Sequence, residues 1–322
     1  HIYKSIACGV LLAMTATSCD LDYNPVDTYS DVTEGVNKTD EKPIFNSVQD
    51  VETSMVTLHK KFRDQQEHWY VDKLLIGDAH SDNAYAGTTG AEVVPYETNS
   101  IEGSNSVLKR DWDRFLGDIA VANRIIVGCD QLKALSESER GKYQSQAKIF
   151  RAMVMFDMVR LWGNFPVITT VGGDITEDNV EEMYPTYFPP QNTAEEAYAQ
   201  IEKDLTEAVE NPNTPTNDTS DKSILTKSVA RAMLAKVYAE KPLRDYAKVI
   251  KYADELAADG FDLVEDFSDL WAYDTEKKDC RVRNTKEAIL EAHFPPGSGN
   301  WCTWMFGRNL SNWDESFTWA KW

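Results

Sequence analysis

One stretch constrains the fold of this chain more than any other: the apolar segment from Tyr143 to Thr170. Its apolar side chains recur every three or four positions, which is the spacing of one face of an α-helix. That face is formed by Tyr143, Ala147, Phe150, Val154, Met158 and Leu161. A second apolar row lies beside it, and Gly163 and Pro166 end the helix. A helix that is apolar nearly all round belongs in the interior of a helical bundle.

Helical patterns also occupy the rest of the chain from Ser47 to Gly260. The longer predicted helices, after a first one that starts near Ser47, cover residues 105–135, 141–162, 193–210, 226–240 and 245–259. The last two are patterned as a tetratricopeptide repeat, although Val249 replaces the usual small residue. Such helix pairs stack so that each buries the apolar side of its neighbour. The predicted fold class is therefore mainly α, with a tetratricopeptide-like helical-repeat body over residues 46–260.

The central helix also resembles a known family. The run Ala147-Lys-Ile-Phe-Arg-Ala152, followed by Phe156-Asp-Met-Val-Arg-Leu-Trp-Gly-Asn-Phe-Pro-Val-Ile168, is similar to the signature helix of the SusD/RagB family. The helix before it and the segment 284–294 resemble the same family, in the same order along the chain. An ordinary buried helix that ends in glycine is the alternative interpretation of the signature segment alone.

The resemblance implies a fold, a function and a partner. Members of this family are surface-exposed, outer-membrane glycan-binding lipoproteins of Bacteroidetes-type bacteria. The resemblance implies that this protein captures oligosaccharide or polysaccharide without catalysis and delivers it to a SusC-like TonB-dependent transporter for nutrient uptake. It also implies a SusD-like body with a loop-rich lobe packed on it.

The composition changes after Gly260, where residues 261–322 are expected to begin the SusD/RagB lobe. Five of the nine tryptophans lie between residues 301 and 322. The run Glu287-Ala-Ile-Leu-Glu291 is expected to form a strand, by resemblance to the family. Because family members are considerably longer, the lobe is expected to be incomplete in this chain.

The N-terminal residues have the features of an export signal. Lys4 precedes an apolar run from Ile6 to Met14, which is too short to cross a bilayer but suits a signal peptide over residues 1–18. Ala16-Thr-Ser-Cys19 resembles a lipobox, with Ala16 in the usual place of leucine. We therefore expect Cys19 to be lipidated and residues 19–45 to form a polar tether. An ordinary signal peptide is the alternative, and since the chain starts at His1, its N-terminus is expected to be incomplete.

The charge of the chain excludes two classes of partner. It contains 33 basic and 53 acidic residues and carries a net charge of −20. Such a chain is repelled by nucleic acid and by anionic lipid, so membrane contact is expected only through the lipid anchor. None of the five cysteines forms a C-x-x-C pair or another spacing suited to zinc, and we expect neither a metal nor a cofactor.

Aromatic residues in loop-like segments are the candidate glycan-binding residues. A sugar ring stacks its apolar side on an aromatic face, while polar groups hydrogen-bond its hydroxyls. The resemblance places these aromatics in the loop after the first helices and in the loops after the repeats. The candidates are Trp69, Tyr85, Tyr96, Trp301, Trp304 and Trp313. Each tryptophan has burial in the core as its alternative role.

Two other functions remain open. The segment Gly77-Asp-Ala-His-Ser-Asp-Asn83 contains Asp78, His80 and Asp82, which suggest a metal site or catalytic pair, but such a turn more often contains Asx-type hydrogen bonds. A glycoside hydrolase would use two carboxylates across a cleft, yet the chain has no recognisable catalytic motif, and we expect no enzyme activity. A tetratricopeptide scaffold that binds a peptide instead of a glycan is the other alternative.

Overall fold

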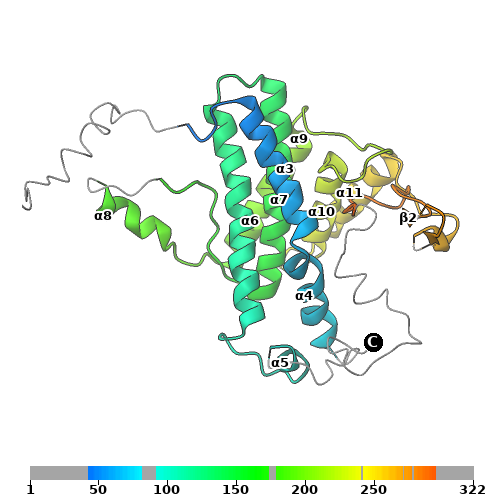
Figure 1. Ribbon diagram of the computed structural model, residues 1–322, viewed down its shortest axis with the longest axis horizontal. Helices are drawn as coiled ribbons and strands as arrows, with labels where there is room; N and C mark the ends of the chain where they lie inside the picture. Colours follow the sequence, from blue (N-terminus) through cyan, green and yellow to red (C-terminus); the bar gives the residue numbers. More distant parts are fainter. Residues whose placement is uncertain are drawn as a thin grey trace, which may run out of the picture. The chain divides into compact units, whose positions relative to one another are not determined.

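The computed structural model describes residues 43–81, 92–173, 179–240, 242–270, 272–277 and 279–294 (Figure 1). Nearly all of these belong to one compact unit that starts at Ile44. The described part is mainly helical, as the sequence predicted. Within it, no helix is both long enough and apolar enough to cross a membrane.

The first long helix is α3, Val48–Asp64. Ser47 and Asp50 start it with a capping box, in which Ser47 accepts from the backbone N–H of Asp50 and Asp50 accepts from that of Ser47. The chain then continues in short turns: η1 (Glu67–Val71), α4 (Asp72–Leu74) and η2 (Leu75–Ala79). After residue 91 comes the short α5, Val94–Glu97.

The helices α6 (Ser106–Gln131) and α7 (Glu137–Trp162) form a hairpin and lie side by side (Figure 1). Asn105 caps α6, and a second capping box of Ser136 and Glu139 caps α7. That box starts α7 four residues before the predicted position. The sequence therefore located both helices and misplaced two ends, since α6 was predicted to continue to residue 135.

Helix α7 is the centre of the core. It packs against α3, α6, α9 (Ala194–Glu210) and α10 (Lys227–Ala239). Phe150 and Met158 are fully buried, as are Ile149 and Met155 on its other side. The prediction that this helix lies inside the bundle is confirmed.

A buried polar network ties α6, α9 and the segment after α7 to Arg151 in the middle of α7. The guanidinium of Arg151 donates to both carboxylate oxygens of Asp204 on α9, at 2.8 and 2.7 Å. It also donates to Oδ1 of Asn123 on α6 at 2.7 Å, and Asn123 donates to the carbonyl of Ile168 at 2.9 Å. This bonding satisfies the buried charges and holds the extended segment after α7 against the bundle.

The last two helices confirm the predicted repeat pair. α10 packs against α9 and against α11 (Tyr246–Ala258). The rings of Tyr238 and Tyr252 stack between α10 and α11 with centroids 6.1 Å apart. Thr226 and Asp245 cap the two helices.

Irregular structure follows Gly260, with η4 (Phe267–Leu270) and a two-residue antiparallel ladder of β1 (Tyr273–Asp274) and β2 (Asp279–Cys280). The expected strand at 287–291 is wrong, because these residues form bends. Ile289 and Leu290 pack against the core, and the N–H of Glu291 donates to the carbonyl of Lys222 at 2.8 Å. Their backbone therefore bonds to a loop rather than to a neighbouring strand.

Candidate functional site

Trp69, a predicted glycan-binding residue, lies in the core. Only 3% of its surface is exposed. Its ring packs against Phe62 and Phe115 edge-on and against Phe150 at a tilt, with centroid distances of 5.2, 5.9 and 5.7 Å. The indole N–H donates to Asp118 at 3.0 Å. With these rings around it and 3% of its surface exposed, Trp69 offers no open face to a sugar.

The partner of Trp69, Asp118, also binds a histidine. Nε2 of His68 lies 2.9 Å from Oδ2 of Asp118, and both side chains are fully buried. Nζ of Lys61 lies 3.6 Å from the other carboxylate oxygen. Three elements thus meet at one buried carboxylate, which fastens the turn η1 to α3 and α6. The group is enclosed and functions as a structural contact, since a substrate has no access to it.

Tyr96, the second predicted residue in the described part, is also buried, with 1% of its surface exposed. Its hydroxyl has no hydrogen-bond partner within the described residues. Burial, together with the nearby carboxylates of Asp111 and Asp72, raises the pKa of Tyr96 to about 12. Tyr96 is therefore a buried core residue of α5 rather than an exposed aromatic platform.

Near Tyr96, the buried carboxyl groups of Asp72 and Asp111 form a charged cluster with the partly exposed Arg110. Arg110 donates to Asp72 and lies 3.7 Å from Asp111. Burial, then the charge of Asp72, raises the pKa of Asp111 to about 8. Asp111 is therefore largely protonated at neutral pH, so that only one of the two carboxyls carries a full charge.

The other predicted residues cannot be placed. Tyr85, Trp301, Trp304 and Trp313 lie outside the described residues, as does Cys19. At the Gly77–Asn83 segment, the N–H and hydroxyl of Ser81 both donate to the carbonyl of Asp78, at 3.1 and 2.7 Å. This is a local turn, formed through backbone oxygen rather than the Asp78 side chain. Across the described ranges, no three His, Cys, Asp or Glu residues are arranged to hold a metal ion.

Sequence reasoning missed a group of exposed aromatic rings between α8 (Val180–Met183) and α9. Tyr184, Tyr187 and Phe188, in and after the turn η3 (Tyr184–Tyr187), expose 55%, 49% and 67% of their surfaces. The rings of Tyr184 and Phe188 lie 5.1 Å apart, and the hydroxyl of Tyr187 donates to the carbonyl of Gly173 at 2.5 Å. The signal was the proline-spaced run Tyr184-Pro-Thr-Tyr-Phe-Pro-Pro190.

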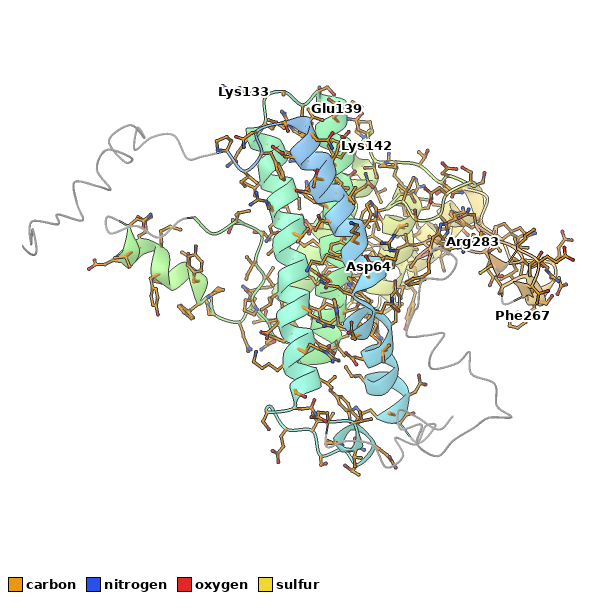
Figure 2. All side chains as sticks on the ribbon, in the orientation of Figure 1. Asp64, Lys133, Glu139, Lys142, Phe267 and Arg283 are labelled. Carbon is orange, nitrogen blue, oxygen red and sulfur yellow. The ribbon has the colours of Figure 1, made fainter. Side chains whose placement is uncertain are left out.

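Sequence reasoning also missed a pocket of about 620 Å³ with a mixed polar and apolar lining, which we call the α3–α7 pocket. Its walls come from α3, from the first turns of α7 and from the loop 215–224 between α9 and α10. Figure 2 shows Lys142, one of its lining residues, near the end of the bundle where α7 begins. A local sequence pattern does not reveal this pocket, because the contact between the loop 215–224 and α3 depends on the tertiary fold.

Comparison with known proteins identifies the family. The sequence profile of a SusD-like family, described as "Starch-binding associating with outer membrane", matches residues 28–239. A SusD-like protein of Bacteroides ovatus is 25% identical over 309 residues, which cover 92% of this chain and 50% of that relative. The chain thus spans about half the length of this relative.

Solved structures share the fold. The surface glycan-binding protein A from Bacteroides fluxus superposes with a TM-score of 0.62 at 20% identity, covering 79% of this chain and 52% of that one. A laminarin-binding SusD-like protein gives a TM-score of 0.59 at 20% identity, covering 70% of this chain and 48% of that one. The profile match extends over most of the chain and includes the signature helix. This chain therefore belongs to the SusD-like family, as its signature helix predicted.

Proposed function

We propose that this protein binds a glycan at the cell surface, without catalysis, and passes it to a SusC-like TonB-dependent transporter. The observation that carries this proposal is the family match over residues 28–239. The solved relatives named above, a glycan-binding protein and a laminarin-binding protein, support it by their own ligands. The binding experiment below compares several polysaccharides to identify the glycan that this protein binds.

Aromatic stacking is the proposed source of affinity. A ring that stacks on a sugar contributes about 1–3 kcal/mol, by analogy with bases on aromatic faces. The proposed platforms are Trp301, Trp304 and Trp313, with Tyr85 from the loop after η2. Because Trp69 and Tyr96 are buried, we assign them the support of that loop rather than direct contact with sugar.

The location follows from the same family. We propose that Cys19 carries the lipid and that the protein lies on the outer face of the outer membrane. The family description, which names association with the outer membrane, supports this location. The acidic residues Asp20 and Asp22 directly after Cys19 resemble the surface-export signal of this bacterial group.

Affinity electrophoresis tests the binding. The protein is run in gels that contain starch, laminarin or xyloglucan, and its retardation is compared with that of a non-binding standard. We expect at least one polysaccharide to retard it. Replacing a stacking tryptophan, as in Trp301→Ala, Trp304→Ala or Trp313→Ala, is expected to weaken binding about tenfold to a hundredfold, with an unchanged melting temperature.

Two results contradict the proposal. If all three variants lower the melting temperature and none selectively lowers affinity, these tryptophans belong to the core. If prolonged incubation shortens the oligosaccharide, the protein is a glycoside hydrolase, and the proposal that it binds glycan without catalysis is wrong.

A further inference from the structure

A group of exposed side chains on α8 and the turn η3 has no part in the proposed function. We call it the α8–η3 patch. Its members are all exposed to solvent: Val180, Glu181, Glu182, Tyr184, Tyr187 and Phe188. The ring centroids of Tyr184 and Phe188 are 5.1 Å apart, so these two rings form one continuous apolar surface. Contiguous exposed apolar surface that is bordered by polar groups is typical of a contact site.

Hydrogen bonds within the turn hold the aromatic rings in place. The hydroxyl of Tyr187 donates to the carbonyl of Gly173 at 2.5 Å, while 49% of the surface of Tyr187 stays exposed. The N–H of Phe188 donates to the carbonyl of Pro185 at 3.1 Å, and the ring of Pro185 restricts the backbone of the turn. A surface that is ordered before it meets a partner loses less conformational entropy on binding.

The chain on both sides of the patch is fastened to the helical body. The N–H of Asn192 donates to the carbonyl of Phe165 at 2.9 Å. The side-chain oxygen of Asn192 accepts from the N–H of Val167, also at 2.9 Å. Phe165 is fully buried in the core. These bonds therefore join the residues before and after the patch to the folded bundle.

The charge around the patch has one sign. Between Arg160 and Lys203 the sequence has no lysine or arginine and eight acidic residues, five of them between residues 174 and 182. Glu181 and Glu182 are exposed, and among the described residues no basic side chain pairs with either of them. The cation–π contacts within the described part of the chain all involve other rings.

The combination of rings and carboxylates narrows the class of partner. An arginine or lysine side chain stacks its cation on an aromatic face, pairs with a carboxylate and packs its apolar stem against a ring. Anionic lipid is repelled by the acidic side chains, and a second copy of a chain of net charge −20 is repelled as well. A neutral ligand would make no use of the charges of Glu181 and Glu182. The patch therefore matches a basic protein surface.

We propose that the α8–η3 patch is a docking surface for a partner protein whose contact face carries arginine or lysine side chains among apolar ones. This contact goes beyond glycan binding, since it uses neither the tryptophan platforms nor the lipid anchor. Opposite charges on the two faces increase their rate of encounter, and the aromatic rings bury apolar area once the faces meet.

Fluorescence anisotropy with labelled peptides tests this docking. The probe is a short peptide that repeats Arg-Leu-Gly, and its neutral counterpart has citrulline in place of arginine. We expect the arginine peptide to bind at least about tenfold more tightly. Tyr184→Ser combined with Phe188→Ser should weaken its binding about fivefold to thirtyfold, because the aromatic faces are lost. Tyr246→Ser combined with Phe267→Ser is the matched control, since both rings are exposed and lie outside the patch.

The carboxylates are tested separately by Glu181→Gln combined with Glu182→Gln, which keeps the shape of both side chains. This variant should bind the arginine peptide more weakly in dilute buffer, and added salt should lower its affinity less than that of the wild type. Asp254→Asn combined with Glu265→Gln is the control for general attraction of a basic peptide by an acidic protein, since both carboxylates are exposed and outside the patch.

Three results overturn the proposal. The first is equal affinity of the wild type for the two peptides, and the second is equal weakening by the patch variants and their controls. The third is a different occupant of the rings: Tyr184→Ser with Phe188→Ser then abolishes retardation by polysaccharide, or converts a dimer to a monomer in sedimentation velocity.

Two further measurements keep the result specific to the patch. Retardation by polysaccharide reports the proposed glycan site and should not change in the patch variants, so either proposal can fail without the other. If the double serine variant lowers the melting temperature, Phe188→Leu repeats the test, because leucine keeps an apolar side chain and removes the aromatic face. Unchanged affinity in Phe188→Leu would then count against the docking surface.

Discussion

Asp111 is buried beside Asp72, and its charged form is disfavoured. Burial and the charge of Asp72 raise the pKa of Asp111 from 3.8 to about 8, against the opposing charges of Arg110 and Arg114. In the unfolded chain the group titrates near 3.8, so folded protein binds one more proton between these values. The contribution of this proton to the unfolding free energy is fully present below about pH 4 and is lost as the pH rises through about 8. The free energy of unfolding should therefore fall over this range.

The substitution Asp111→Asn tests this dependence, because asparagine stays neutral and keeps an N–H donor for Asp72. We expect the pH dependence of the unfolding free energy between pH 5 and 8 to flatten, by a difference on the order of a few kcal/mol. Denaturant titrations across that range measure it. Asp113→Asn is the matched control, since Asp113 is exposed and pairs with Lys109. An equal slope in wild type and Asp111→Asn would contradict the assignment.

The burial of Trp69 could not be predicted from the sequence around it. Trp69 follows a helix and precedes a glycine-containing turn, a setting that is typical of a loop aromatic. Its neighbours Phe115 and Phe150 come from α6 and α7, far along the chain. No local pattern predicts that these two distant helices enclose this ring.

Local chemistry determines where the main helices begin. Ser136 accepts from the N–H of Glu139 at 3.2 Å, and the Glu139 carboxylate accepts from the N–H of Ser136 at 2.9 Å. Ser136→Ala removes one half of this capping box and should lower the unfolding free energy by about 1 kcal/mol. Urea unfolding measures the change. Ser138→Ala, at an exposed site in the first turn of the helix, should change it little, and equal effects at both positions would contradict the role of the cap.

At the scale of elements, the sequence predicted what short-range patterns encode. Apolar spacing located α6, α7, α9, α10 and α11, although the end of α6 and the start of α7 each lie four residues from the predicted position. The prediction of a strand at 287–291 was wrong, because a strand needs a neighbouring strand to pair with. Within the described residues, this segment meets a loop instead.

At the scale of the molecule, the α3–α7 pocket and the Arg151 network depend on contacts that composition does not reveal. Arg151 is a charged residue in a mostly buried helix, and its local sequence does not reveal a partner. The structure pairs it with Asp204 on another helix. The family resemblance did predict the mainly helical fold, because the signature helix specifies the centre of the bundle. It did not predict the exposed rings of Tyr184 and Phe188, which lie outside that signature.

The net charge of −20 predicts that the protein associates with membranes only through its lipid. If membrane contact depends on the lipid at Cys19, wild-type protein from cells should enter the detergent phase and incorporate a fatty-acid analogue, whereas Cys19→Ala should do neither. The Cys19→Ala protein should also fail to sediment with anionic vesicles, because the acidic protein and the lipid surface repel each other. Cys280→Ala is the control, since Cys280 is an exposed cysteine outside the N-terminal segment. Detergent partitioning of Cys19→Ala, or its binding to anionic vesicles, would show a second route to the membrane.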